Sequence, residues 1–285
     1  MSVEIKSARE IEAIRASSQM AAETMLLVAE KLRPGMTTDE IDRFVHEDTI
    51  RRGARPSTLN YHGFPKSLCT SVNHVVCHGI PGAEVLRDGD IVNLDLTTFY
   101  NGMHGDTSAT LYIGTPSPDA IEVTEAARQA LAIGIAQVRE GARLGDIGAA
   151  IEEYVTGLGL STVRDYTGHG IGRKFHEPPS VHHYGKRGTG LRLKAGMVFT
   201  IEPMINLGTY EVDLLGDNWT VVTRDRKLSV QFEHTIAVTR DGADILTKRP
   251  GVLHLSEDVP WAQPTAALSA PPTLPLRSKG RRRRR

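Results

Sequence analysis

The stretch GDIVNLD, residues 89–95, begins with a glycine, continues through residues typical of a buried strand and ends on a carboxylate. The stretch GMVFTIE, residues 196–202, repeats this pattern at an offset of 107. Short β-branched runs that open on glycine predict strands. Because side chains alternate along a strand, Asp95 shares a face with Asn93 and Thr97, opposite three apolar side chains. The two stretches therefore predict equivalent strands that each end on an acidic residue.

The repeat extends upstream into predicted helices. Residues 21–35 (AAETMLLVAEKLRPG) resemble residues 126–141 (AARQALAIGIAQVREG), and at an offset of 106 the helix-ending glycines coincide, Gly35 with Gly141 and Gly53 with Gly159. Apolar residues at helical spacing predict helices near residues 7–32, 38–52, 119–139 and 145–158. We therefore expect an α+β fold whose halves, about residues 1–115 and 116–254, are related by a pseudo-two-fold axis.

Each half also supplies a second carboxylate on a later strand. In the first half, two predicted strands, residues 90–100 and 104–113, are joined by an Asn-Gly turn, which brings Asp106 beside Asp95. In the second half the equivalent acid is Glu233. The order of helices, glycines and acids is thus the same in both halves.

Four acids are expected to face one another across the pseudo-two-fold axis: Asp95, Asp106, Glu202 and Glu233. For Asp95 alone, a solvated position on an edge strand is the simpler interpretation. Three further acids in similar apolar, strand-like surroundings weaken this interpretation. Carboxylates within a few ångströms raise one another's pKa, and no Lys or Arg adjoins these positions in the sequence. Two divalent cations would balance the four charges, so the pattern predicts a dinuclear metal site.

Several histidines stand in loop motifs. His169 lies in GHGIG, which is neither a dinucleotide fingerprint, since the next residue is arginine, nor a P-loop. His176 is followed within two residues by a pair of prolines, which exclude the helix of an H-E-x-x-H zinc site. His78, before a Gly-Ile-Pro turn, is either merely exposed or a catalytic group near neutral pH. The pair His182 and His183 is interpreted as ordinary loop or strand residues.

Composition excludes several classes of protein. The chain has 285 residues, of which 40% are hydrophobic, enough for a sizeable core. Its two cysteines, Cys69 and Cys77, exclude a disulfide framework and a Cys₄ zinc module. No stretch approaches the ~18–20 apolar residues that span a membrane. The N-terminal sequence lacks the apolar segment of a secretory signal, so we expect a cytoplasmic protein.

The net charge of zero hides a division of the chain. Residues 255–285 carry seven basic and two acidic side chains and end in five arginines, whereas residues 1–254 carry 27 basic and 32 acidic ones. Five of the fifteen prolines also lie in the C-terminal segment. We therefore predict a disordered, Pro-rich basic tail over residues 255–285. It is either simply solvated or an arm that binds phosphate, in which case ribosomal RNA is the expected partner.

Six motifs in order make residues 5–248 resemble a type I methionine aminopeptidase: YHGFPKS (61–67), VCHGIP (76–81), HGDT (104–107), GHGIG (168–172), FTIEPM (199–204) and QFEHT (231–235). The resemblance implies the pita-bread fold, in which two pseudo-two-fold-related halves share a central antiparallel sheet backed by helices. It also implies that residues 1–254 form one metallo-aminopeptidase catalytic domain.

The resemblance implies five metal ligands, four of which the repeat also indicates: Asp95, Asp106, His169, Glu202 and Glu233. Asp106 and Glu233 would bridge two ions. Asp95 would bind one of these ions, and His169 and Glu202 the other. An oxygen-rich site with one imidazole suits Mn²⁺, Fe²⁺ or Co²⁺ and does not exclude Zn²⁺.

The implied reaction removes the initiator methionine from nascent proteins whose second residue is small, with a metal-activated water as the nucleophile. Glu202 would act as general base, and His176 would stabilise the oxyanion. His78 would contact the nitrogen on the leaving side of the substrate. The methionine pocket would be lined by Tyr61, Phe64, Cys69, His78, Phe175 and Trp219. The protein is expected to be a monomer that acts on N-termini of nascent chains.

Two alternative functions remain open. A prolidase or Xaa-Pro aminopeptidase shares the fold and the metals, but such proteins carry a large N-terminal domain, and this chain starts within a few residues of its first predicted helix. The predicted pocket with Cys69 and Trp219 also disfavours proline. A non-catalytic relative that binds RNA or protein is the second alternative, and it is disfavoured because all five ligands are present.

Overall fold

The computed structural model describes residues 3–249, so the predicted basic tail, residues 255–285, lies outside the described residues. The described chain begins with two capped helices, α1 (Ala8–Ala29) and α2 (Thr38–Arg51). In each, a hydroxyl at the N-cap and a glutamate three residues later form a reciprocal capping box, Ser7 with Glu10 and Thr37 with Glu40. Both helices fall within the ranges that the apolar spacing predicts.

The strands of the first half follow these helices. They are β1 (Arg55–Pro56), β2 (Cys69–Val72), β3 (Val75–Cys77), β4 (Ile91–Tyr100) and β5 (Met103–Tyr112), with a short 3₁₀ turn, η1, at Tyr61–Gly63. β4 lies between β1 and β2 and also pairs with β5, always antiparallel. Asn101 and Gly102, at φ of 50° and 81°, make the tight turn between β4 and β5 that the Asn-Gly pair predicts.

The second half repeats the order of two helices followed by short strands. Its elements are α3 (Pro118–Ala136), α4 (Leu144–Gly157), β6 (Ser161–Thr162), β7 (Gly168–Gly170), β8 (Glu177–Val181), β9 (Val198–Ile201), β10 (Met204–Asn206), β11 (Val212–Leu214), β12 (Val221–Thr223), β13 (Ser229–Gln231), β14 (His234–Val238) and β15 (Ala243–Ile245). The described strands form four small sheets, of which the largest has the order β15-β14-β9-β7-β8. All the strand pairs are antiparallel.

Equivalent hydrogen bonds fix the two halves in the same way. The amide of Gly35 donates to the carbonyl of Leu86 at 2.8 Å, and the amide of Gly141 donates to that of Leu193 at 3.0 Å. Both glycines have a φ near +90°, a conformation that a side chain disfavours. The internal repeat in the sequence therefore corresponds to a repeat in the backbone.

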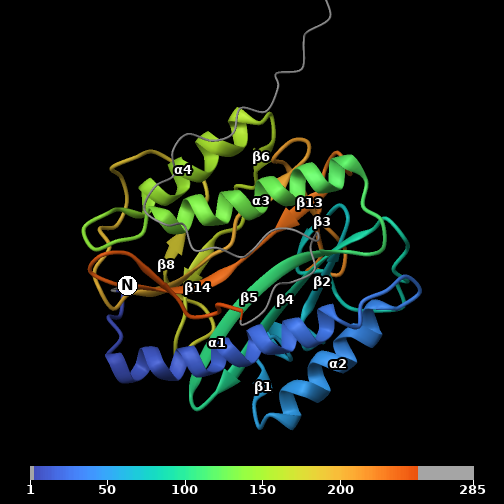
Figure 1. The fold of residues 1–285 in the computed structure, drawn as a ribbon, viewed down its shortest axis with the longest axis horizontal. Helices are drawn as coiled ribbons and strands as arrows, with labels where there is room; N and C mark the ends of the chain where they lie inside the picture. Colours follow the sequence, from blue (N-terminus) through green and yellow to red (C-terminus); the bar gives the residue numbers. More distant parts are fainter. Residues whose placement is uncertain (1–2, 250–285) are drawn as a thin grey trace, which may run out of the picture.

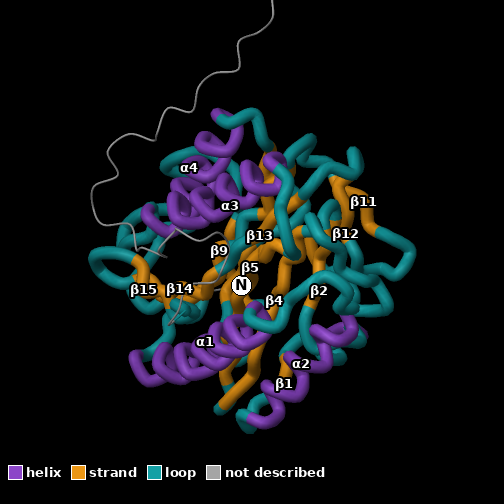
Figure 2. The backbone as a smooth tube through the Cα atoms, turned by 45° about the vertical axis from the view of Figure 1, so that its right-hand side comes forward, coloured by secondary structure: helices purple, strands orange, loops and turns teal. Residues whose placement is uncertain are grey.

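Both helix pairs cover the same side of the strands (Figures 1 and 2). α1 packs on β4 and β5, while α3 packs on β9, β10 and β13. The apolar face of β4, Val92, Leu94 and Leu96, is buried in the core beneath these helices. Its polar face, which carries Asp95, therefore points away from the helices.

Helix α1 approaches β5 closely because one strand residue lacks a side chain. A Cβ placed on Gly105 would lie 2.3 Å from the backbone nitrogen of Ser18. The neighbouring Ser17 hydroxyl donates to the carbonyl of Met103 at 2.9 Å. The glycine in the HGDT motif therefore allows helix and strand to touch while the adjacent Asp106 faces the other side of the sheet.

Candidate metal centre

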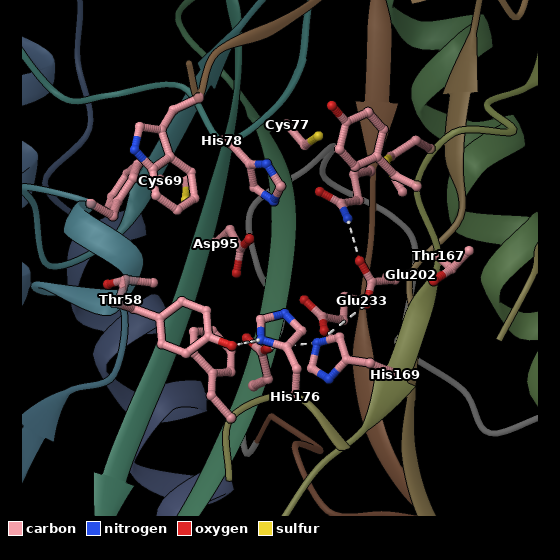
Figure 3. A pocket seen from close by; sticks show the side chains of 18 of the residues that line it. Thr58, Cys69, Cys77, His78, Asp95, Thr167, His169, His176, Glu202 and Glu233 are labelled. Atoms are coloured by element: carbon pink, nitrogen blue, oxygen red, sulfur yellow. Dashed lines mark hydrogen bonds and ion pairs between the residues drawn. The ribbon is translucent and has the colours of Figure 1, made fainter. Parts of the chain in front are cut away.

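One cavity of about 290 Å³ gathers all of the residues that the sequence analysis nominates. Its walls include the predicted ligands, both predicted catalytic histidines and every predicted residue of the methionine pocket: Asp95, Asp106, His169, Glu202, Glu233, His78, His176, Tyr61, Phe64, Cys69, Phe175 and Trp219. Figure 3 shows Asp95, His169, Glu202 and Glu233 from different segments of the chain turned toward the same space.

The four acids come from both halves. Thr97 on β4 is directly opposite Asp106 on β5, so Asp95 and Asp106 are diagonal neighbours on one face of the hairpin. Glu202 directly follows β9, and Glu233 lies between β13 and β14. These two acids thus stand just beyond strand ends, where the sequence pattern had placed Glu233 within a strand.

Distances between ligand atoms fit a shared ion. Nε2 of His169 lies 3.5 Å from Oδ2 of Asp106 and 3.7 Å from Oε1 of Glu202. Asp106, His169 and Glu233 each offer one atom, and these atoms all lie within 4.8 Å of one another. Nδ1 of His169 lies 3.0 Å from the carbonyl oxygen of Gly170, which orients this nitrogen as the donor and leaves Nε2 with a free lone pair. The imidazole is therefore oriented as a metal ligand.

Burial of these acids without a counter-ion is costly. Burial, and next the charge of Asp106, raises the pKa of Asp95 and of Glu233 well above the usual carboxyl range. Burial also raises the pKa of Glu202 to about 7, although the nearby His169 opposes the shift. Oε1 of Glu233 is buried and has no hydrogen-bond partner within residues 3–249. This set of donors is buried and rich in oxygen, and one of its oxygens has no hydrogen-bond partner among the described residues, so it fits divalent cations.

One protein cation contributes to the charge balance, and the sequence analysis missed it. Arg249 is buried and interacts electrostatically with Glu233. Its Nη2 donates to the hydroxyl of Thr107 at 2.9 Å, and that hydroxyl donates to the carbonyl of Glu233, also at 2.9 Å. Arg249 lies sixteen positions from Glu233, so it is not a sequence neighbour of any of the four acids. A single arginine does not balance four carboxylates, so the requirement for metal ions remains.

Two histidines line the cavity beside the carboxylates. His176 lies against His169, with ring centroids 4.0 Å apart, and its Nδ1 is 2.8 Å from the hydroxyl of Tyr61. His78, at a φ of 56°, lies edge-on to Trp219. Burial lowers the pKa of His176 to about 3 and that of His78 to about 4. Both imidazoles are therefore neutral near pH 7.

Aromatic and sulfur-containing side chains form the apolar end of the cavity. Phe64 packs edge-on against Trp219, with ring centroids 5.2 Å apart. The buried thiol of Cys69 and two residues that the sequence analysis did not nominate, Cys77 and Met204, also line this cavity. A slot with this lining suits an unbranched thioether side chain.

Glu202 is held by three groups that the sequence analysis did not assign to the site. The Thr200 hydroxyl donates to its Oε1 at 2.6 Å, and the Gln231 amide donates to its Oε2 at 3.2 Å. Its backbone N–H donates to Nε2 of His183 at 3.1 Å. The sequence analysis interprets His183 as an ordinary loop or strand residue. The structure places it in a loop, fully buried, and adds this hydrogen bond to the backbone of Glu202. Adjacent His182 is exposed.

Replacing His183 by leucine is expected to lower the turnover number about tenfold with little change in KM. The leucine leaves the buried N–H of Glu202 without an acceptor, at a cost of about 1–3 kcal/mol, and lets the carboxylate move. His182→Leu is the matched control, since it makes the same change at the exposed neighbour. Equal turnover numbers for the two variants would show that His183 does not position Glu202.

The loop that carries Phe175 and His176 is anchored to the N-terminal segment. The buried ammonium of Lys6 donates to Oε2 of Glu177 at 2.7 Å. Oε1 of Glu177 accepts from the backbone N–H of Lys174 at 3.0 Å. Breaking a buried ion pair of this kind is costly because one charge remains uncompensated. The pair thus fixes the backbone on both sides of His176.

The described residues contain no helix that is long and apolar enough to cross a membrane. The buried carboxylates together with His169, at the junction of the two repeated halves, form a donor set typical of a metal-dependent hydrolase. The chain belongs to metallopeptidase family M24, whose family model matches residues 12–240.

Within this family, the chain belongs with the methionine aminopeptidases. It is 51% identical to methionine aminopeptidase A of Synechocystis, over 86% of this chain and 97% of that protein. It is 46% identical to the Escherichia coli methionine aminopeptidase, over 87% and 95% of the two chains. The crystal structure of the Rickettsia prowazekii methionine aminopeptidase superposes with a TM-score of 0.86 at 48% identity, over 87% of this chain and all of that one. These matches confirm the predicted fold family.

A Xaa-Pro dipeptidase from Bacillus anthracis shares only the fold. It superposes with a TM-score of 0.71 at 24% identity, and this chain covers 62% of that protein. The prolidase alternative is therefore disfavoured both by identity and by coverage.

Proposed function

We propose that this chain removes the N-terminal methionine from polypeptides whose second residue is small, by metal-dependent hydrolysis of the first peptide bond. The observation that carries the proposal is the single cavity that joins an acidic, metal-fitting end to a sulfur- and aromatic-lined end. We further propose that the protein works as a cytoplasmic monomer on the N-termini of nascent chains.

Five side chains would hold two divalent ions: Asp95, Asp106, His169, Glu202 and Glu233. Mn²⁺, Fe²⁺ and Co²⁺ suit such oxygen-rich donors, and Zn²⁺ is compatible with them. When bound, such ions lower the pKa of water and polarise a carbonyl oxygen. Four carboxylates and one imidazole would complete the ligand set, so neither cysteine of the cavity is needed as a ligand.

The protein's own groups would move the protons. Glu202 would accept a proton from the attacking water and return it to the nitrogen that leaves as the C–N bond breaks. The Tyr61 hydroxyl would donate to Nδ1 of His176, 2.8 Å away, so that Nε2 would carry the proton and donate to the carbonyl oxygen as its charge develops. His78, neutral as well, would accept from or donate to the backbone at the leaving side of the substrate. The methionine side chain would lie against the surface that Phe64 and Trp219 form together.

Methionine release from the tripeptides Met-Ala-Ser and Met-Leu-Ser tests this function. Chelator-treated protein is expected to be inactive and to recover with Mn²⁺, Co²⁺, Fe²⁺ or Zn²⁺, with the first peptide cleaved at least about tenfold faster. Glu202→Gln, which keeps the size of the side chain but cannot accept the proton, is the matched inactive variant. No release with any metal would contradict the proposal and favour the alternative of a non-catalytic binding protein.

A further inference from the structure

A second hollow adjoins the metal centre. It has a volume of about 460 Å³ and shares three walls with the catalytic cavity: Tyr61, Phe175 and His176. This volume lies within the roughly 300–1,000 Å³ that is usual for ligand sites. Because the two hollows meet at the pair Tyr61 and His176, a chain that leaves the reacting bond past this pair enters the second hollow directly.

Most of the remaining lining residues of this hollow are polar or basic, and two, Pro56 and Leu59, are apolar. They come from three separate segments: Arg55, Pro56, Ser57, Leu59 and Asn60 on and after β1, His104 on β5, and Lys174 in the loop before β8. No aspartate or glutamate is among the lining residues. The hollow therefore differs in charge from the catalytic cavity, whose wall carries the four ligand acids.

Both cations of the hollow lack an acidic partner. No carboxylate of residues 3–249 lies within ion-pair distance of Arg55 or Lys174, although the adjacent Arg173 pairs with Glu10 at 2.9 Å. The Arg55 guanidinium lies over the ring of Phe99, 4.2 Å from its centroid, which holds it in place without neutralising it. Lys174 is exposed, and its backbone is fixed by Glu177. Two positive charges thus line a hollow whose lining residues include no aspartate or glutamate, and the charge of Arg55 is held in place by Phe99.

Polar groups of the same hollow can bind a peptide backbone. The Ser57 hydroxyl lies 2.8 Å from Nδ1 of His104, and both residues line the hollow. An extended peptide advances about 3.3–3.6 Å per residue. The third and fourth residues of a substrate therefore lie about 3–11 Å beyond the reacting bond, close enough to reach a hollow that adjoins the catalytic cavity.

We propose that the hollow bounded by Arg55 and Lys174 binds the third and fourth residues of the substrate and selects acidic side chains there. This inference rests on the proposed function, because it assumes that a peptide is cut at the neighbouring carboxylates. It adds a second determinant of specificity to the small second residue. Substrates of the preferred class begin Met, then a small residue, then aspartate or glutamate.

Three C-terminally amidated peptides test the inference: Met-Ala-Asp-Asp, Met-Ala-Asn-Asn and Met-Ala-Lys-Lys. Exposed ion pairs favour the first peptide over the second in kcat/KM by about two- to fivefold per pair. The Lys-Lys peptide is expected to be the poorest substrate. Raising the salt from about 0.05 M to about 0.5 M shortens the Debye length to a few ångströms, so the preference is expected to shrink.

The double variant Arg55→Gln, Lys174→Gln is expected to bring the ratio of kcat/KM for the Asp-Asp and Asn-Asn peptides close to one. Arg128→Gln, which removes one positive charge on α3 far from the hollow, is the control and is expected to keep the wild-type ratio. An unchanged ratio in the double variant, with normal cleavage of the Asn-Asn peptide, would overturn the inference while leaving the proposed function intact.

A binding measurement distinguishes two outcomes: that the hollow does not select acidic residues, and that the protein does not cleave these peptides. If none of the three peptides releases methionine, the proposed function is wrong, and the hollow is judged from the anisotropy of the same peptides with a C-terminal fluorophore. A lower Kd for the Asp-Asp peptide than for the Lys-Lys peptide, lost in the double variant, supports the inference. Equal Kd values overturn it.

Discussion

Asp106→Asn is expected to lower methionine release from Met-Ala-Ser by more than about a hundredfold in metal-replete buffer. Loss of a group that only orients a ligand typically costs about 10–100-fold in metal affinity or activity, and loss of a ligand costs more. Oδ2 of Asp106 lies 3.5 Å from Nε2 of His169. A ligand atom of Asp106 also lies within 4.8 Å of a carboxylate oxygen of Glu233. The amide of asparagine retains one oxygen but carries no charge, so the variant binds cations weakly.

The fold of Asp106→Asn is expected to persist. The asparagine oxygen can still accept the hydrogen bond from the Thr97 hydroxyl, now 2.7 Å from Oδ1 of Asp106. The Thr235 hydroxyl bonds to the backbone of residue 106 on both its N–H and its carbonyl, and the substitution leaves these bonds unchanged. Removing one of several repelling carboxylates should keep the melting temperature of the metal-free variant at or above that of the metal-free parent.

The control for this experiment is Asp241→Asn, which makes the same change in an exposed turn. It is expected to retain parental activity, while circular dichroism confirms that both variants are folded. Parental rates in Asp106→Asn would contradict the assignment of Asp106 as a metal ligand. A collapse of the fold in that variant alone would contradict the hydrogen-bond argument.

The features that the sequence analysis predicted correctly are those encoded locally or by repetition. Helical spacing, the Asn-Gly turn and the glycine that opens β4 each depend on neighbouring residues, so each can be found in a single stretch. The acids were found because the same pattern occurs twice, at residues 89–95 and 196–202. Two copies supply the evidence that one buried Asp95 alone lacked.

The features that were missed depend on contacts between distant segments. His183 binds the backbone of a residue 19 positions away, and Lys6 pairs with a residue 171 positions away. Arg249 reaches Thr107 across 142 positions. None of these residues lies in a motif whose composition signals a role. Their contribution follows from strand pairing and from the loop next to β8, which a single sequence does not specify.

The charge of the missed residues also changes the physical account of the site. Metal ions were predicted because no lysine or arginine adjoins the four acids in the sequence. The structure adds one buried arginine near Glu233, together with hydroxyl and amide donors on Asp106 and Glu202. These groups stabilise only part of the negative charge, since burial still raises the pKa of Asp95, Glu202 and Glu233. Repulsion among these buried carboxylates therefore destabilises the folded protein when no metal is bound.

Divalent metal is therefore expected to raise the melting temperature, and more so at pH 7.5 than at pH 5.5. A carboxyl whose pKa is raised on folding, such as Glu202 from 4.5 to about 7, favours the folded state at low pH. That contribution is lost as the pH rises from 4.5 through about 7, so the metal-free protein becomes less stable between these two pH values. Metal needs the deprotonated carboxylates, so its affinity increases over the same range.

The expected size of the metal effect follows from mass action. At a fixed free Mn²⁺ concentration of about 100 times the Kd at pH 7.5, binding stabilises the folded state by about 2.7 kcal/mol at that pH. The same concentration stabilises it less at pH 5.5, where the Kd is higher. For a domain of this length, the stabilisation at pH 7.5 corresponds to a rise of about 5–10 °C in Tm. Differential scanning fluorimetry with and without chelator at the two pH values measures it, with Asp106→Asn as the variant expected to show a much smaller rise. An equal rise at both pH values would mean that the buried carboxylates do not exchange protons for metal, and the electrostatic account of this site would be wrong.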